Sequence, residues 1–117
     1  CIGSGTTASR RIAIALSLVI AAGTGPPVLA GDAKAGRTKA LACQACHGLD
    51  GLSKVPDAPN LAGQVEGYLV TQLRAFKSGA RKSEAMSLVA ATLSEQDIDN
   101  LAAYYAAIEV QLGRVPE

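Results

Sequence analysis

The chain has 117 residues, of which 49% are hydrophobic and only 3% aromatic, and its formal net charge is +1. This length fits one small domain. The near-neutral charge disfavours nucleic acid and acidic membrane surfaces as partners, because both attract clearly basic proteins.

Residues 1–30 have the pattern of an export signal. A pair of arginines precedes an apolar run over 12–22, and Val28-Leu29-Ala30 offers a cleavage site after Ala30. The apolar run is short for a membrane span, so cleavage is favoured over a retained anchor. These features predict a periplasmic mature domain, residues 31–117, with no stable membrane insertion.

The predicted mature domain has little material for a large core. It has 87 residues with nine basic and ten acidic side chains, and it contains one Phe, three Tyr and no Trp. A domain this small and this poor in aromatic volume needs a stabilising element beyond its own apolar side chains.

A first helix is predicted over about 33–45, with Asp32 as its N-cap. It leads into the run Cys43-Gln44-Ala45-Cys46-His47. C-x-x-C-H is the pattern of covalent c-type haem attachment, in which each thiol adds to one vinyl group of the porphyrin. The adjacent histidine then lies beneath the iron and binds it through a ring nitrogen. The motif predicts one covalent haem c, which would also be the stabilising element that the small core requires.

Three other interpretations of the motif are weaker. A thioredoxin-like C-x-x-C requires a βαβ context, and no alternating β-branched runs flank this one. A structural zinc site requires four ligands, but apart from Cys1, ahead of the export signal, the chain offers only Cys43, Cys46 and His47 as soft ligands. A disulfide between the two neighbouring cysteines would close a very short loop and leave the histidine unexplained.

A loop, a second helix and another loop are predicted next. Residues 48–63 show no helical or strand period, and a loop this long in a small domain is expected to cover something, here the haem. A second helix is predicted over about 64–78, with Gly79 just past its end. Apolar side chains share one face of it at helical spacing: Val65, Leu69, Leu73 and Phe76. Residues 79–93 are predicted to be irregular.

The second irregular segment carries Met86, the single methionine of the chain. A thioether opposite a histidine raises the potential of a haem iron, which suits an electron carrier. Methionines more often fill gaps in a core, but this one is expected in a loop, away from any apolar stripe. Because His47 is the only histidine, the second axial ligand is Met86, a lysine such as Lys77 or Lys82, or absent. Met86 is favoured.

A third helix is predicted from Ser94 to about Val110. Ser94 and Asp97 approximate a capping box, and Leu93 and Ile98 fit the positions of a hydrophobic staple. One face carries an apolar stripe: Ile98, Leu101, Ala102, Tyr105 and Ile108. Three helices without strand signals predict an all-α fold.

Taken together, residues 31–117 resemble a class I (monohaem) bacterial cytochrome c. The matching pieces are CQACHG, PNLAG at 59–63, YLVTQLRAFKSGAR at 68–81, Met86 and LSEQDIDNLAAYYA at 93–106. The chain looks similar to a single half of the two-haem periplasmic cytochromes that feed terminal oxidases, and to the small cytochrome subunit of flavocytochrome c sulfide dehydrogenase. The resemblance implies three main helices and loops wrapped around one covalent haem.

The resemblance also implies roles for individual residues. Cys43 and Cys46 would carry the thioether links, and His47 and Met86 would be the axial ligands. Pro59 matches the proline whose carbonyl accepts the other N–H of the axial histidine and so orients the ring. A simple loop turn is the alternative role of this proline.

Other matches concern packing and the haem edge. Gly36 matches the small residue where the first and last helices cross, with Leu101 and Tyr104 as partners on the last helix. Ala40 departs from the commoner bulky aromatic, which is expected to loosen this crossing. Tyr68 and Arg81 are candidate donors to haem propionates. The alternative explains them equally well: Tyr68 is simply an exposed tyrosine and Arg81 a solvated arginine.

The expected function is one-electron transfer rather than catalysis, since no nucleophile, acid–base pair or substrate pocket is visible. The expected partners are redox proteins: a terminal oxidase, a cytochrome complex or a flavoprotein dehydrogenase. One alternative is a cytochrome subunit bound permanently to a dehydrogenase, as in flavocytochrome c sulfide dehydrogenase. Another is a gas- or peroxide-binding haem protein, which requires an open sixth position on the iron.

Overall fold

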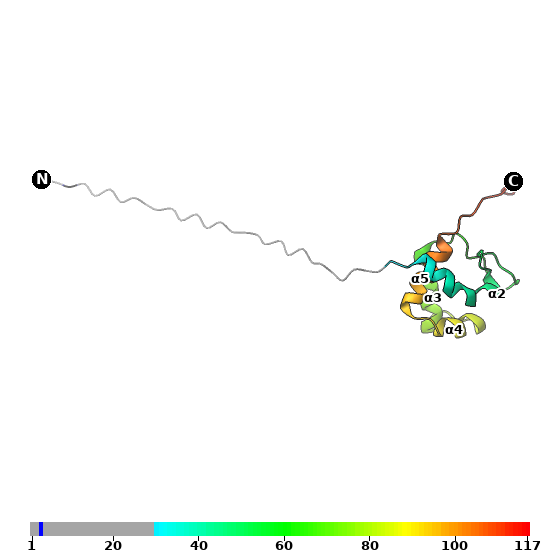
Figure 1. The fold of residues 1–117 in the computed structure, drawn as a ribbon, viewed down its shortest axis with the longest axis horizontal. Coiled ribbons are helices and arrows are strands. Elements are labelled where there is room, and N and C mark those ends of the chain that lie inside the picture. Colours follow the sequence, from blue (N-terminus) through cyan, green and yellow to red (C-terminus); the bar gives the residue numbers. More distant parts are fainter. Residues whose placement is uncertain (1–2, 4–29) are drawn as a thin grey trace.

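The computed structural model describes residue 3 and residues 30–117, so the predicted export signal lies outside the described residues apart from these two positions. Residues 30–117 form helices and loops without any strand, which confirms the all-α fold class (Figure 1). The elements are α1 (Ala33–Lys39), a 3-10 turn η1 (Ala40–Ala42), α2 (Gln44–His47), α3 (Glu66–Ser78), α4 (Glu84–Ala91) and α5 (Glu95–Ala106). None of these helices has the length and apolar character needed to cross a membrane.

The first predicted helix, 33–45, is divided in the structure. The Asp32 carboxylate caps α1 as expected, by accepting hydrogen bonds from the backbone amides of Lys34 at 2.8 Å and Ala35 at 3.3 Å. The helix then tightens into the 3-10 turn, and a turn at Cys43 precedes the single turn of α2. Because of this change in direction, the C-x-x-C-H run forms a short helix of its own.

α3 begins at Glu66 rather than at Gln64. Gly79 ends it in the left-handed conformation, with φ of 82°, which confirms its predicted place just past the helix. Leu69 is buried, but Val65 is 67% exposed, so its place in the apolar stripe was wrong. Val65 has extended backbone at the N-cap, and its side chain therefore does not follow the helical period.

The prediction that 79–93 is irregular was wrong. Its centre forms α4, whose N-cap Ser83 accepts a hydrogen bond from the backbone amide of Met86. Met86 therefore lies on a helix and not in a loop. With eight residues, α4 is too short to show a clear apolar period, so only the serine followed by Glu84 indicated it in the sequence.

α5 carries the predicted capping box of Ser94 and Asp97, with Asp97 in the place more often taken by glutamate. It ends at Ala106, earlier than the predicted Val110. Most of the buried core lies on or against this helix: Ala40, Leu69, Leu93, Ile98, Leu101, Ala102 and Tyr105. Ala40 is fully buried even though it is small.

α1 crosses α5 at Gly36, as predicted. A Cβ atom at Gly36 would collide with the backbone carbonyl of Asn100 and would lie 2.8 Å from Cβ of Tyr104. Gly31 approaches Asp99 and Ala103 in the same way. The two helices therefore touch backbone to backbone, and this contact fixes the direction in which α1 delivers the chain to Cys43.

Gly36→Ala is expected to lower the free energy of unfolding by about 1–3 kcal/mol, the usual cost of overpacking a close contact. Denaturant unfolding of the haem-loaded protein measures this change. Gly67→Ala is the matched control, because nothing lies within 4 Å of a Cβ at this α3 position. That variant should be unchanged or more stable by up to about 1 kcal/mol. Equal stability of the two variants would contradict a close crossing at Gly36.

Candidate haem-binding site

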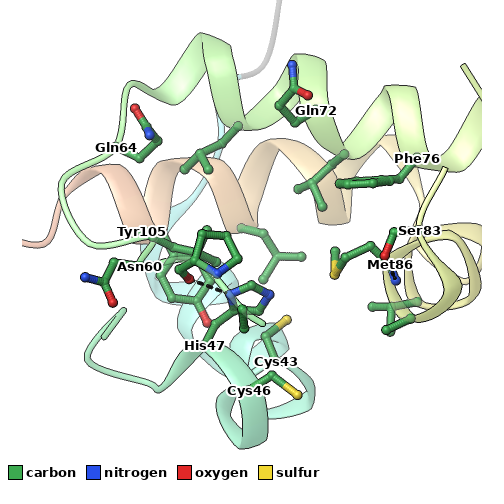
Figure 2. Close-up of a pocket in the computed structure, with 18 of the residues that line it drawn as sticks. Cys43, Cys46, His47, Asn60, Gln64, Gln72, Phe76, Ser83, Met86 and Tyr105 are labelled. Carbon is green, nitrogen blue, oxygen red and sulfur yellow. Dashed lines mark hydrogen bonds between the residues drawn. The ribbon is translucent and has the colours of Figure 1, made fainter. Parts of the chain in front are cut away.

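A cavity of about 560 Å³ lies between α2, α3, α4 and α5. Apolar side chains form most of its walls, among them Leu69, Leu73, Phe76, Val89 and Leu101. The loop 48–63, expected to cover a bound group, lines it from Val55 to Leu61. Figure 2 shows this cavity with the cysteines at one edge.

Cys43 and Cys46 both line the cavity as free thiols, contrary to the disulfide alternative. The Cys43 side chain is partly covered, whereas Cys46 is exposed. Burial raises the pKa of the Cys43 thiol, and the charge of Lys39 together with a hydrogen bond to Tyr105 opposes this only in part. The edge of the cavity therefore presents one sheltered and one accessible sulfur.

The imidazole of His47 forms one wall and is only 8% exposed. Its Nδ1 lies 2.9 Å from the carbonyl oxygen of Pro59. Because a carbonyl can only accept, Nδ1 carries the proton and donates it. Nε2 has no hydrogen-bond partner among the residues described, so it is the ring nitrogen available to bind a metal. The contact with Pro59 is the one that the resemblance implied.

Two tyrosines of α5 bind the chain just after His47, which the sequence did not indicate. The hydroxyl of Tyr104 donates to the carbonyl of Leu49 at 2.5 Å, and that of Tyr105 donates to the carbonyl of Gly48 at 3.2 Å. Burial raises the pKa of Tyr105, with smaller effects from Cys43 and Tyr104. The end of α2 is thus fixed by a helix more than 50 residues away in sequence.

Met86 lines the cavity, and its side chain points from α4 toward the His47 ring (Figure 2). Of the two lysines considered as alternative ligands, only Lys82 lines the cavity. The ammonium of Lys77 instead donates to the carbonyl of Leu93 at 2.5 Å and lies 3.8 Å from the Glu95 carboxylate. The Lys77 side chain therefore links α3, on which it lies, to the start of α5.

The two candidate propionate donors both border the cavity. Tyr68 is 49% exposed. Arg81 is more constrained, because its Nη1 donates to Oε1 of Gln72 at 2.7 Å and its guanidinium lies 4.6 Å from the centre of the Phe76 ring. Arg81 is exposed as well, so its contact with a propionate stays a prediction.

The donor set fits a haem iron. Two thiols lie at one edge, an imidazole forms one wall, and a thioether points toward the imidazole from α4. Histidine and methionine are the axial pair of c-type electron carriers, and an apolar surround suits the porphyrin. Within the described part of the chain, no three His, Cys, Asp or Glu side chains converge as a metal site of another kind.

Comparison with known proteins agrees with this geometry. The profile of the cytochrome c family matches residues 33–107. The chain belongs to the cytochrome c family. Its cofactor is a covalently attached haem c, and its cytochrome c4 relatives are electron-transfer proteins rather than enzymes.

Relatives of three kinds match this cytochrome. Cytochrome c4 of Pseudomonas aeruginosa is 44% identical over 99 residues, which are 84% of this chain and 49% of the relative. Cytochrome c-554(548) of Halomonas halodenitrificans is 45% identical over 83 residues, 68% of this chain and 100% of the relative. A thiosulfate dehydrogenase electron acceptor of Thiomonas intermedia is 44% identical over 73 residues, 61% of this chain and 33% of the relative.

The fold also matches a solved cytochrome. Reduced recombinant cytochrome c4 from Pseudomonas stutzeri gives a TM-score of 0.66 at 42% identity, with 72% of this chain and 49% of that chain covered. The chain spans about half the length of its cytochrome c4 relatives. The predicted resemblance to a class I cytochrome, and to one half of a larger one, is confirmed.

Tyr105→Phe is expected to lower the free energy of unfolding by about 1 kcal/mol, the net contribution of a typical hydrogen bond, since the carbonyl of buried Gly48 loses this donor and keeps only the Gly51 amide at 3.2 Å. Denaturant unfolding of the haem-loaded protein provides the measurement. Phenylalanine keeps the ring in the core, so packing is preserved and the difference isolates the hydroxyl. An unchanged unfolding midpoint would mean that this hydroxyl does not hold the end of α2.

Proposed function

We propose that this cytochrome is a periplasmic one-electron carrier in which Cys43 and Cys46 hold the haem and His47 and Met86 bind its iron. The observation that carries the proposal is the fixed imidazole of His47 with a thioether pointing toward it. When bound, the haem supplies an iron that alternates between the ferric and ferrous states and so takes up or gives up one electron.

His47 and Pro59 together set the properties of one axial bond. Donation from Nδ1 to the Pro59 carbonyl keeps the ring in one orientation and leaves Nε2 free for the iron. The same hydrogen bond makes the imidazole a stronger donor, because it places negative charge next to Nδ1–H. Pro59 thus orients His47 and tunes its basicity.

Met86 supplies the opposite bond in this proposal. A neutral, polarizable thioether favours the reduced iron, which raises the potential. Leu73, Phe76 and Leu101 exclude water from the cavity walls, which also favours the less charged iron site. These residues set the potential without taking part in any bond change.

The cysteine edge is the proposed path for electrons. Cys46 is exposed there, and the residues that precede it on η1 and α2, 40–45, are uncharged. Leu41 on η1 and Leu88 on α4 are 50% and 73% exposed. A partly apolar rim suits brief contact with another redox protein.

Met86→Ala tests the iron ligands. The reduced, haem-loaded variant should bind carbon monoxide and should have a lower reduction potential, because the sixth position is left open. Visible spectra with and without the gas, and a redox titration, provide the readouts. Leu88→Ala is the control, since it truncates a solvent-facing residue of the same helix. A Met86→Ala protein that ignores the gas and keeps its potential would show that the ligand assignment is wrong.

A second candidate is a subunit bound permanently to a dehydrogenase. The relative named as a thiosulfate dehydrogenase electron acceptor favours a dehydrogenase as electron donor. The apolar side chains Leu41 and Leu88 would then lie in a lasting interface.

Native purification of the tagged chain from its own cells distinguishes the two candidates. A free carrier elutes as a single small protein and is reduced by added dehydrogenase at a rate proportional to the dehydrogenase concentration. A bound subunit elutes in a fixed ratio with an enzyme and is reduced by that enzyme's substrate without further addition. Reduction independent of added enzyme would therefore reject the free carrier.

A further inference from the structure

Two serine hydroxyls enclose the residue that carries the thioether. The Ser83 Oγ accepts a hydrogen bond from the backbone amide of Met86 at 3.2 Å. The backbone amide of Ser83 donates in turn to the Ser87 Oγ at 3.1 Å, and the amide of Ser87 donates to the Ser83 carbonyl at 3.0 Å. All three residues are partly buried, and Ser83 and Met86 both line the cavity.

α4 depends on such end contacts more than the longer helices do. It has eight residues, well below the about 12–15 at which a helix becomes stable in isolation. Its helix packing is against α3. The segment that contains it is tied to α3 at both ends, where the amide of Arg81 donates to Ala75 at 3.0 Å and Lys77 donates to Leu93.

Those end ties set where the segment begins and ends, but not the rotation of Met86 toward the cavity. That rotation depends on where helical backbone starts, because each residue shifts the side-chain direction by one step of the 3.6-residue period. Ser83 has extended backbone and marks the start, and its hydroxyl binds the amide of Met86 itself. The cap therefore acts directly on the residue whose side chain enters the cavity.

We propose that Ser83 is a positioning residue for Met86, whose hydroxyl fixes the backbone amide of Met86 and so holds the thioether on the iron. This inference rests on the proposed function, in which Met86 is the axial ligand. Loss of the hydroxyl raises the fraction of molecules in which the sulfur leaves the iron and an external ligand enters.

The test compares Ser83→Ala with Ser94→Ala in the reduced, haem-loaded protein. Ser94 caps α5 in the same way, by accepting from the amide of Asp97 at 3.0 Å, but α5 carries no proposed iron ligand. Both variants lose a serine cap and should show similar falls in unfolding midpoint. Only Ser83→Ala should bind carbon monoxide faster, by about fivefold, the equilibrium change that corresponds to a typical cap loss of about 1 kcal/mol.

Two further variants sharpen the result. Ser83→Thr keeps a capping hydroxyl and should restore slow binding of the gas. Ser83→Gly removes the hydroxyl at a cost of only a few tenths of a kcal/mol to the helix, so it stays folded if Ser83→Ala does not. The Ser83→Gly protein should still bind carbon monoxide faster than the unmodified protein.

The outcomes of this test separate the ligand assignment of Met86 from the positioning role of Ser83. Met86→Ala provides the reference for a fully open site, and its failure to bind the gas would reject the proposed ligand set itself. If Met86→Ala opens the site but Ser83→Ala and Ser83→Gly react as slowly as the unmodified protein, the positioning role is wrong. Equal opening in Ser94→Ala would also overturn it, because the effect would then follow from stability alone.

Discussion

The close crossing of α1 and α5 is the constraint on which the rest of the structure depends. Backbone contact at Gly36 sets the path of α1, and α1 continues through the 3-10 turn into Cys43 and His47. The same α5 supplies Tyr104 and Tyr105, whose hydroxyls bind the carbonyls just after His47. The haem-binding run is therefore fixed by one helix from both its beginning and its end.

The two proposed axial ligands are supported in different ways. His47 is buried, its ring is oriented by Pro59, and the two residues after it, Gly48 and Leu49, are held by long-range hydrogen bonds from α5. Met86 lies on the short α4, and its amide is bound by the nearby Ser83. Hydrogen bonds between distant segments cost more free energy to break than local ones, since two separate elements must move apart. The histidine side is thus the rigid wall of the cavity and the methionine side the more adjustable one.

The sequence predicted the elements that have local signals. The Asp32 cap of α1, Gly79 at the end of α3 and the Ser94–Asp97 box of α5 each depend on residues only a few positions apart, and the structure contains all three. α4 was missed because eight residues give no clear apolar period. The C-x-x-C-H run indicated the cofactor because covalent haem attachment allows little variation in the spacing of these residues.

What could not be predicted depends on tertiary contacts. The hydroxyl of Tyr105 binds a carbonyl 57 positions earlier, and the sequence marked this residue only as part of an apolar stripe. The engagement of Lys77 with Leu93 likewise appears only when α3 and α5 lie together. Residue type can indicate that a hydroxyl or ammonium needs a partner, but the fold decides which one.

The α1–α5 crossing also joins the two ends of the domain. The backbone amide of Asp32 donates to Oδ1 of Asn100 at 2.8 Å, across 68 positions of sequence. A contact between such distant segments forms late, because the whole intervening chain must be available before the loop closes. Until α5 is available, α1 has no helix to pack against. Cys43, which the finished fold partly covers, stays accessible over that interval, so late closure of the α1–α5 contact leaves time for haem attachment before the domain closes.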